Sequence, residues 1–298
     1  MTTLVCFGFG YSAKHFVRMF ETKFTGIVGT VRDPERAAAL STKSLKGVVF
    51  DGKSATPELR GAIVEAKAVL ISVPPDENGD PVLRLLGEQL DRAGKLQSIV
   101  YLSTIGVYGD CGGAWVDEGT PPEPRAARSR ERLAAERAWQ EFGERRGVPV
   151  AILRLAGIYG PGQNALVQIA SGRARRIVKP GQIFNRIHVD DIAQAIDAAF
   201  ERRASGLFNV ADDEPTPPGD PIVFAAQLMG VAPPPEVAFD SAAPSMSPMA
   251  LSFWQECRRV HNDKLKRVLG VRLRYPTYRE GLRALHASAG ATSEGSAL

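Results

Sequence analysis

The sequence predicts a doubly wound α/β fold, in which helices cover both faces of a parallel sheet. Short apolar runs of strand length alternate with helical segments from the N-terminus to about residue 153, which is the pattern of repeated strand–helix–strand units. The first apolar run, at 4–7, ends in Gly8 and Gly10, and apolar residues at helical spacing follow. Right-handed crossovers would then distribute the helices over both faces of the sheet.

The N-terminal turn carries the pattern G-x-G-x-x-A, with Gly8, Gly10 and Ala13 as its small residues. Gly8 permits a tight turn, Gly10 leaves room for a pyrophosphate against the backbone, and Ala13 lets the helix pack close to the strand. Free N–H groups at the helix N-terminus favour an anion there. The pattern predicts a Rossmann dinucleotide site whose contacts include Tyr11 and Ser12. The alternative is a glycine-rich turn without a ligand.

Composition limits the class of protein. The 298 residues are 44% hydrophobic and 23% charged, which is ordinary for a globular chain of one large domain or two small ones. No apolar run approaches the roughly 20 residues that span a bilayer, and no secretory signal precedes the first strand. We therefore expect a cytoplasmic protein that makes no membrane contact. The sequence does not decide whether the protein forms a homodimer.

The charged residues favour a small anionic ligand over nucleic acid. Basic residues alternate with acidic ones, which is typical of solvated helix faces, and the net charge of +4 suits a nucleotide. Three scattered cysteines, Cys6, Cys111 and Cys257, predict neither disulfides nor a zinc site. No other metal site is predicted.

The alternation predicts the elements beyond the fingerprint helix. Strands are expected at 26–31, 47–50, 68–73, 98–103 and 150–153, and helices at 34–40, 57–66, 81–93 and 125–146. After residue 162 the rhythm changes, and a short helix and a basic stretch lead to a β-like piece ending at Val189. A helix at 192–200 and a strand at 206–210, which returns to the sheet, follow.

The change of rhythm predicts two structural parts. Residues 1–164 are expected to form the dinucleotide-binding Rossmann domain, to which 188–211 returns. A smaller, proline-rich lobe that faces the substrate is expected from 165–187 and 212–287, finishing in two helices near 262–269 and 278–287. The small, polar end at 288–298 is predicted to be disordered.

The residues after the second and third strands bear on the choice of cofactor. A site that prefers NAD usually places an acid after the second strand for the ribose 2′-hydroxyl. Arg32 instead suits the 2′-phosphate of NADP, although Asp33 follows it and a solvated arginine is the alternative. We therefore predict NADP in preference to NAD. Asp51 is placed to accept a hydrogen bond from the adenine amino group, or it is a simple turn aspartate.

Several stretches in order resemble the extended short-chain dehydrogenase/reductase superfamily, and within it the epimerase/dehydratase group. The resemblance covers residue 1 to about 211 and continues in VHNDKLKRVLG at 260–270. It implies a dinucleotide-binding oxidoreductase that acts on a small molecule such as a nucleotide-sugar. The stretches that carry it are FGFGYSA at 7–13, YLSTIGVYGD at 101–110, ERLAAERAW at 131–139, LRLAGIYGPG at 153–162 and IHVDDIAQAI at 187–196.

The resemblance implies a chemistry of Ser/Thr, Tyr and Lys. In this family the Tyr is the general acid/base, the Lys binds the nicotinamide ribose and lowers the Tyr pKa, and the Ser/Thr hydrogen-bonds the substrate oxygen. Thr104 falls on the Ser/Thr position, but Arg128 and Arg132 stand where the Tyr-x-x-x-Lys pair is expected. A guanidinium cannot cycle a proton at neutral pH, so Arg128 cannot replace the tyrosine.

Arg128 and Arg132 share a helix face because they are four residues apart. Arg132 can still donate hydrogen bonds to the ribose, and the pair could clamp a carboxylate or phosphate near the nicotinamide. The alternative is two solvated arginines. We assign Thr104, Arg128 and Arg132 to the catalytic site, and expect substrate contacts from Thr104, Tyr108, Arg128, Asn185 and Arg186.

The departure from Tyr and Lys is similar to that in the atypical branch of the superfamily, as is the segment Ile71-Ser72-Val73-Pro74-Pro75, whose Ser72 joins the expected cofactor contacts. His188 is interpreted as a packing residue. Other residues in loops at the carboxyl edge of the sheet could supply the proton relay, namely Tyr108, Tyr159, Asp117 and Glu118.

Two functions fit these observations. The first is an NADP-linked reductase, epimerase or dehydratase acting on a polar, anionic small molecule. The second is a non-catalytic dinucleotide sensor that signals through partners. The missing Tyr and Lys favour the sensor, whereas the full-length substrate lobe favours the enzyme, because a sensor need not keep it. Fold alone does not decide between them.

Overall fold

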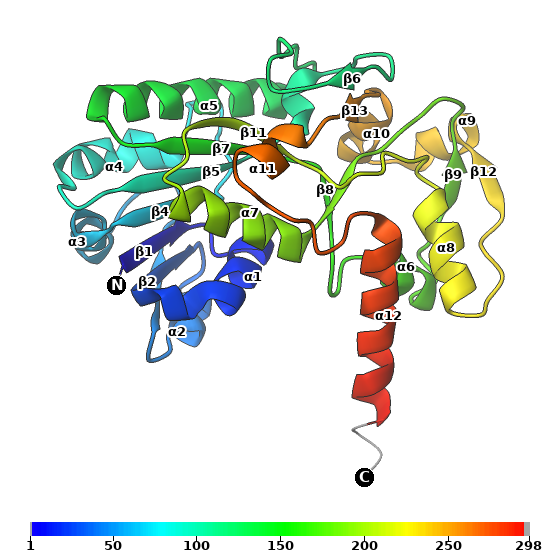
Figure 1. Ribbon diagram of the computed structural model, residues 1–298, viewed down its shortest axis with the longest axis horizontal. Coiled ribbons are helices and arrows are strands. Elements are labelled where there is room, and N and C mark those ends of the chain that lie inside the picture. The colour runs from blue at the N-terminus through cyan, green and yellow to red at the C-terminus, as the bar shows by residue number, and fades with distance from the viewer. Residues whose placement is uncertain (1, 295–298) are drawn as a thin grey trace.

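The structure, a computed structural model, describes residues 2–294. Its centre is a parallel seven-stranded sheet with the order β3-β2-β1-β4-β5-β7-β11 (Figure 1). The strand order reverses between β1 and β4, as in doubly wound sheets that bind ligands at the carboxyl ends of their strands. The predicted Rossmann-like α/β fold is thereby confirmed. The strands are β1 (Thr2–Phe7), β2 (Phe24–Val31), β3 (Leu45–Val49), β4 (Ala68–Ile71), β5 (Ser98–Thr104), β7 (Val150–Leu155) and β11 (Gly206–Val210).

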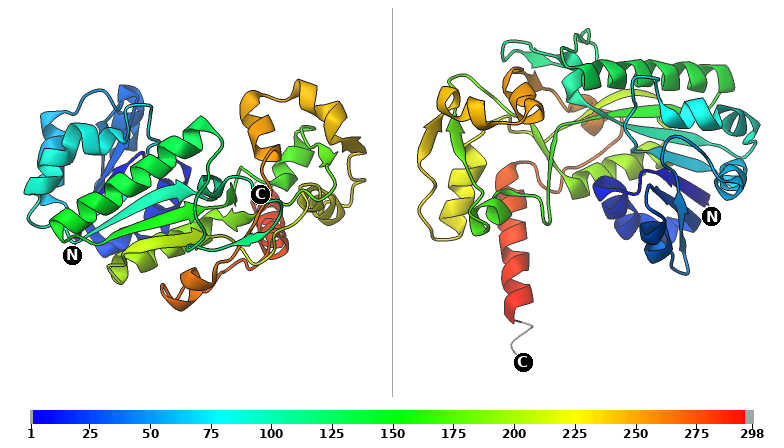
Figure 2. Two further views of the ribbon diagram at one scale, coloured as in Figure 1. Left: turned by 90° about the horizontal axis from the view of Figure 1, so that it is seen from above. Right: turned by 180° about the vertical axis from the view of Figure 1, so that it is seen from behind.

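Helices cover both faces of this sheet (Figure 2). One face packs on α1 (Tyr11–Phe20) and α7 (Val189–Glu201), with α2 (Pro34–Leu40) beside β2 and β3. The other face packs on α3 (Pro57–Glu65), α4 (Pro81–Arg92) and α5 (Ala127–Arg146).

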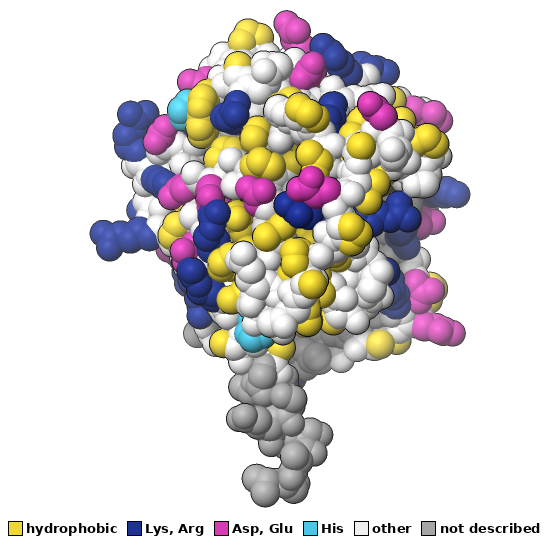
Figure 3. Space-filling model, turned by 90° about the vertical axis from the view of Figure 1, so that its right-hand side faces the viewer, with side chains coloured by type: hydrophobic (Ala, Val, Ile, Leu, Met, Phe, Trp, Pro, Cys, Tyr) yellow, Lys and Arg dark blue, Asp and Glu magenta, His cyan; other side chains and the backbone are white. Residues whose placement is uncertain are grey.

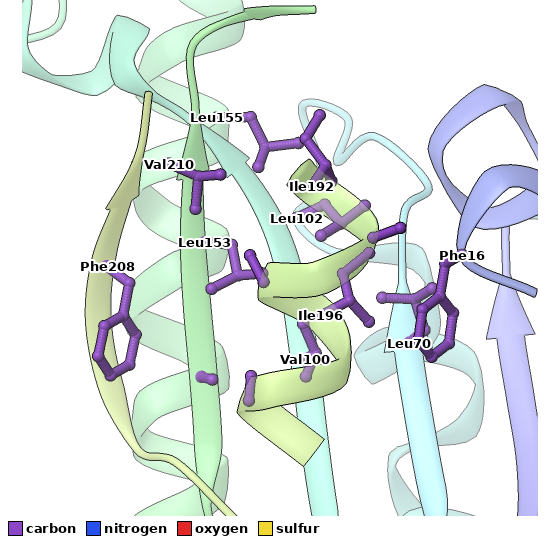
Figure 4. Packing of buried hydrophobic residues seen from close by; sticks show 14 of the residues in the cluster. Phe16, Leu70, Val100, Leu102, Leu153, Leu155, Ile192, Ile196, Phe208 and Val210 are labelled. Carbon is purple, nitrogen blue, oxygen red and sulfur yellow. The ribbon is translucent and has the colours of Figure 1, made fainter. Parts of the chain in front are cut away.

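Successive strand residues divide between the two hydrophobic cores, because side chains alternate along a strand. In β1, Leu4 and Cys6 join the core under α1 and α7, whereas Val5 and Phe7 join the core under α3 to α5. Figure 4 shows the first of these cores, with Phe16 and Ile196 facing the strand residues. Burial on both faces explains why the central strands read as continuous apolar runs.

A smaller lobe lies beside the carboxyl ends of the strands (Figures 1 and 2). A separate apolar cluster joins α6 to α8 and to α12, and includes Leu166, Ile222 and Leu282. Hydrophobic side chains run through the middle of the lobe's outer end, interrupted by a row of charged ones (Figure 3). The lobe elements are α6 (Ala165–Ala170), β9 (Arg176–Val178), α8 (Asp220–Leu228), β12 (Glu236–Ala238), α9 (Phe239–Ala242), α10 (Pro248–Trp254) and α12 (Tyr278–Glu294).

Short elements connect the two parts. The 3₁₀ helix η2 (Ile105–Tyr108) follows β5 directly. Strand β8 (Gly157–Tyr159) pairs with β10 (Arg186–His188), and β6 (Trp115–Val116) pairs with β13 (Arg259–Val260). These pairs bring segments distant in sequence to the carboxyl edge of the main sheet.

Two segments differ from the sequence expectation. Helix α11 (Asp263–Arg267), expected in the lobe, packs against β11, because Leu265 and Leu269 are buried in the sheet core. The end expected to be disordered continues α12 to Glu294, and its alanines are strong helix formers. Residues 295–298 lie outside the described part of the chain. Within residues 2–294, no helix has the length and apolar character that crossing a membrane requires.

Candidate active site

The N-terminal turn is tight and leaves the start of α1 without a side-chain cap. Gly8 has φ +81°, and a Cβ there would lie 2.9 Å from the backbone nitrogen of Val73, so only glycine fits. Gly10 is the N-cap of α1, and no side chain caps that end. A Cβ at Gly10 would meet no protein atom closer than 3.9 Å. The free N–H groups of α1 therefore open onto space that a dinucleotide phosphate fits.

A cavity of about 1020 Å³ joins this region to the lobe. Ser12 of α1 and Ser72 after β4 line one end, whereas α8, α10 and α12 line the other. Among the predicted site residues, the structure brings seven to this cavity: Ser12, Ser72, Thr104, Arg128, Arg132, Asn185 and Arg186.

The two arginines of α5 that line the cavity, Arg128 and Arg132, are engaged by protein groups. Arg132 donates a hydrogen bond through Nη1 to the carbonyl oxygen of Leu102 at 2.8 Å, and its guanidinium lies over the ring of Tyr101. Arg128 donates through Nη2 to Ser252 Oγ at 2.8 Å, and its guanidinium lies 4.4 Å from the ring centroid of Phe253. Arg128 is half-buried and lines the cavity, so it is not a freely solvated arginine.

Two hydroxyl groups flank Gly106 in the same cavity. Thr104 Oγ1 accepts the N–H of Gly106 at 3.0 Å. A Cβ on Gly106 would lie 3.3 Å from Thr104 Oγ1 and 3.1 Å from Ser129 Oγ. Ser129 is 4% exposed and lines the cavity. Sequence reasoning missed it, because no motif marks it beyond its place directly after Arg128.

The family model of the NAD dependent epimerase/dehydratase family matches residues 76–211, which include the ends of β5 and β7 and the whole of α5. A solved protein from Silicibacter pomeroyi DSS, described as functionally unknown and conserved, is 45% identical over 97% of this chain and 99% of its own, with a TM-score of 0.86. Residues 76–211 of the chain thus resemble the epimerase/dehydratase family in sequence.

Other relatives extend this comparison. A structure described as a putative NAD-dependent epimerase/dehydratase, from Methylobacillus flagellatus, shares the fold at 24% identity, covering 97% of this chain and 98% of its own, with a TM-score of 0.73. A 3-diazoavenalumate denitrifying reductase of a Streptomyces species is 29% identical over 138 residues, 44% of this chain and 45% of that protein. Protein YeeZ of Escherichia coli is 29% identical over 58% of this chain and 63% of its own length. The chain thus matches about half the length of these curated relatives.

Tyr108, expected to contact the substrate, does not line the cavity. It is 1% exposed, its hydroxyl donates to Asn209 Oδ1 at 2.8 Å, and the guanidinium of Arg154 lies over its ring. The expectation is corrected, because η2 turns this side chain into the core under α7.

Asn185 lines the cavity, but both ends of its amide bind the protein. Its Nδ2 donates to the carbonyl oxygen of Arg258 at 3.0 Å, and its Oδ1 accepts the N–H of Val260 at 2.9 Å. The side chain therefore positions β13 beside the cavity, and its expected contact with substrate stays a prediction.

Arg186 also lines the cavity, and its guanidinium is held by two protein acceptors. Its Nη1 donates to Thr216 Oγ1 at 2.6 Å and to the carbonyl oxygen of Phe184. Burial lowers its pKa, while the nearby carboxylate of Asp212 acts in the opposite sense. Burial also raises the pKa of Asp212 to about 8.

The remaining predicted cofactor contacts lie outside the cavity. Tyr11 donates its hydroxyl to the carbonyl oxygen of Pro161 at 3.0 Å and so ties α1 to the loop after β8. Asp51 Oδ1 accepts the N–H groups of Lys53 and Ser54, which hold its pKa below the usual range. Arg32 is exposed at the end of β2, and its role stays a prediction.

The alternative proton donors are also occupied. The carboxylate of Asp117 caps its own turn by accepting the N–H of Gly119, and Glu118 Oε1 accepts the N–H of Asn209 at 2.7 Å. Tyr159 lines the cavity from β8 and donates to the carbonyl oxygen of Thr277, and burial raises its pKa.

Within residues 2–294, Tyr159 and Tyr278 are the tyrosines that line the cavity, and neither lies on α5. No tyrosine of the described chain therefore lines the cavity from α5, where the resemblance places the phenol. His188 is buried, accepts the N–H of Asp190 at 3.1 Å and caps α7, which confirms its packing role. Burial lowers its pKa to about 4, so it is neutral at physiological pH.

Proposed function

We propose that the protein is an NAD(P)(H)-dependent oxidoreductase that acts on a small anionic molecule without a Tyr–Lys pair. The observation that carries this proposal is the continuous cavity, which joins Ser12 near the start of α1 to Arg128 of α5 and Arg186 of β10. Two solved structures of MoeE5, in complex with NAD and with UDP-glucose or UDP-glucuronic acid, share the fold at 22% and 21% identity. Nucleotide-sugars are therefore one candidate class.

The dinucleotide would be held by residues from four segments. The backbone of the turn at 8–12 would hold the pyrophosphate, and Ser72 and Arg132 would lie along the nicotinamide half. Arg32 would bind the 2′-phosphate, so NADP is preferred. When bound, the nicotinamide supplies hydride transfer.

The chain's own residues would orient the substrate. Thr104 and Ser129 offer neutral hydroxyls that hydrogen-bond a substrate oxygen, and Arg128 binds a negative charge within reach of them. None of these groups is a tyrosine phenol, so a proton would pass through a hydroxyl or through water. The match to a reductase agrees with hydride transfer as the reaction type.

A dinucleotide sensor is the second candidate. The arginines at the family's Tyr and Lys positions favour it, because neither can cycle a proton. The large cavity favours the enzyme, since a sensor of the dinucleotide alone does not need a second compartment at the lobe.

Deuterium transfer distinguishes the two candidates. The purified protein is incubated with a small-molecule extract of its source cells and with NADPH deuterated at C4, each face in turn, and products are analysed by mass spectrometry. An enzyme places deuterium in a discrete small molecule, and the Gly10→Val variant does not. If the protein binds NADPH but no deuterium appears, the sensor is the better assignment.

A further inference from the structure

The lobe side of the cavity is walled by apolar and aromatic side chains. Its members include Phe184, Ile222, Met249, Phe253, Trp254 and Leu282. Trp254 lies at the centre of an aromatic cluster, with ring centroids 5.2 Å from Phe184 and 5.3 Å from Phe239. A wall of this kind binds by removing apolar surface from water.

Three large apolar side chains that line the cavity are exposed to solvent. Ile158 is 37% exposed, Phe253 is 54% exposed and Met249 is 64% exposed, and all three line it. Large apolar side chains gathered at a concave site mark a surface that a ligand covers. Because Met249 and Phe253 stand on the same short helix, α10, one flat ligand would cover both.

Positive charge adjoins this wall. The cavity lining contains four arginines and two acidic residues. The arginines are Arg128, Arg132, Arg186 and Arg258, and the acids are Glu131 and Glu256. Arg258 is 9% exposed, and its Nε has no hydrogen-bond partner among the described residues. A buried donor of this kind is costly unless an acceptor binds it.

Arg128 combines the two features in one place. Its guanidinium lies over Phe253 in a cation–π contact at 4.4 Å, and among residues 2–294 its hydrogen-bond partner is Ser252. A guanidinium has five N–H donors in a planar fork, so the edge not used by Ser252 matches a carboxylate. A ligand with its carboxylate on that edge would lay its body beside the Phe253 ring.

We propose that the substrate is a small carboxylic acid with a flat, aromatic body, whose carboxylate binds Arg128 and whose ring packs on Phe253 and Trp254. The inference rests on the proposed function and narrows its substrate class. A nucleotide-sugar fits this wall less well, because its hydroxyl and carbonyl groups need hydrogen-bond partners when buried. Among the aromatic side chains named here, the indole N–H of Trp254 is the one polar group.

Calorimetric titration with four probes tests the class. The probes are trans-cinnamate, trans-cinnamamide, acrylate and UDP-glucose, each titrated into the full-length protein with saturating NADP and, in a second series, NAD. We expect cinnamate to bind at least tenfold more tightly than its neutral amide, than acrylate, which lacks the ring, and than UDP-glucose. Tighter binding of UDP-glucose, or equal binding of cinnamate and its amide, overturns the inference.

Three variants test the residues. Arg128→Met should weaken cinnamate at least tenfold and leave the amide unchanged, whereas Phe253→Ala should weaken both alike. Arg130→Met is the matched control, because Arg130 is exposed on the same helix and does not line the cavity. Equal loss of both probes in Arg128→Met overturns the carboxylate assignment.

The dinucleotide titration separates this inference from the proposed function. If NADP or NAD binds and cinnamate does not, the substrate class is wrong and the proposed function stands. If neither dinucleotide binds, the proposed function itself is wrong.

Discussion

Arg128 donates a hydrogen bond to Ser252 across 2.8 Å, between residues 124 positions apart in the chain. This bond joins the start of α5 to α10 of the lobe. Arg128 thus bridges the sheet domain and the lobe at the cavity, with its guanidinium against Phe253. Its place suits binding a charge, and its chemistry does not suit moving a proton.

Arg128→Tyr should not confer turnover on nucleotide-hexoses. The side chain at Arg132 is held by the carbonyl oxygen of Leu102, and it would still stand where a lysine lowers the phenol pKa. The measurement is conversion of UDP-glucose with NAD, followed by chromatography, for wild type and variant. Arg128→Tyr combined with Arg132→Lys serves as the comparison. Measurable epimerisation by the wild type would show that another group of the chain supplies the acid.

Gly10→Val should abolish dinucleotide binding without unfolding the protein. A Cβ at Gly10 would meet no protein atom closer than 3.9 Å, so we expect the added methyl groups to clash with the pyrophosphate and not with the protein. Saturable NADPH binding, followed by fluorescence, should disappear while the thermal midpoint stays near that of wild type. Gly61→Val, also in open space but on α3, should bind normally. Unchanged NADPH binding in Gly10→Val would contradict the assignment of the dinucleotide site to the N-terminal turn.

Arg32→Ala should weaken NADPH and leave NADH nearly unchanged. One hydrogen bond to a charged group contributes about 1.5–3 kcal/mol, which corresponds to a loss of roughly ten- to a hundredfold. The measurement is the dissociation constant of each cofactor, with Arg36→Ala, an exposed arginine one turn into α2, as control. Equal losses for the two cofactors would mean that Arg32 does not contact the 2′-phosphate.

Arg154→Met should destabilise the fold strongly. Arg154 and Glu136 form an ion pair at 2.7 Å with side chains 2% and 1% exposed, and removing one partner of such a pair costs about 3–5 kcal/mol. Arg145→Met breaks an exposed pair with Asp91 and should cost about 1 kcal/mol or less. Urea unfolding of both variants gives the comparison. Similar losses in the two would show that burial of the pair does not matter.

Asp212→Asn should remove part of the pH dependence of stability. Burial raises the pKa of Asp212 from its ordinary 3.8 to about 8. The folded state therefore holds a proton that the unfolded state has released, so this stability is present below about pH 4 and is lost as the pH rises through about 8. A tenfold difference in proton affinity between the folded and unfolded states corresponds to about 1.4 kcal/mol.

Urea unfolding at pH 5 and pH 8 measures this effect. Wild type should lose more free energy of unfolding between the two values than Asp212→Asn does. Asp240→Asn, at an exposed position on α9, should keep the wild-type slope. If Asp212→Asn loses as much free energy of unfolding between pH 5 and pH 8 as wild type does, another group causes the pH dependence.

Local sequence pattern was enough to predict the fold class and the glycine turn that follows the first strand. The strand at 4–7, the glycines that follow and the helix from Tyr11 are set by burial period and by backbone freedom, which act over a few residues. At the chain end, where local composition predicts disorder, α12 runs to Glu294.

Which groups the side chains contact was decided by the tertiary structure. The sequence alone determined the α/β alternation, the open turn at Gly10 and the absence of the Tyr-x-x-x-Lys pair. Only the folded chain decided that Tyr108 turns into the core, that Asn185 binds β13 and that Arg128 meets Ser252. The physical reason is range: periodicity records which face of an element is buried, whereas each of these contacts joins segments more than 70 positions apart, which packing alone brings together.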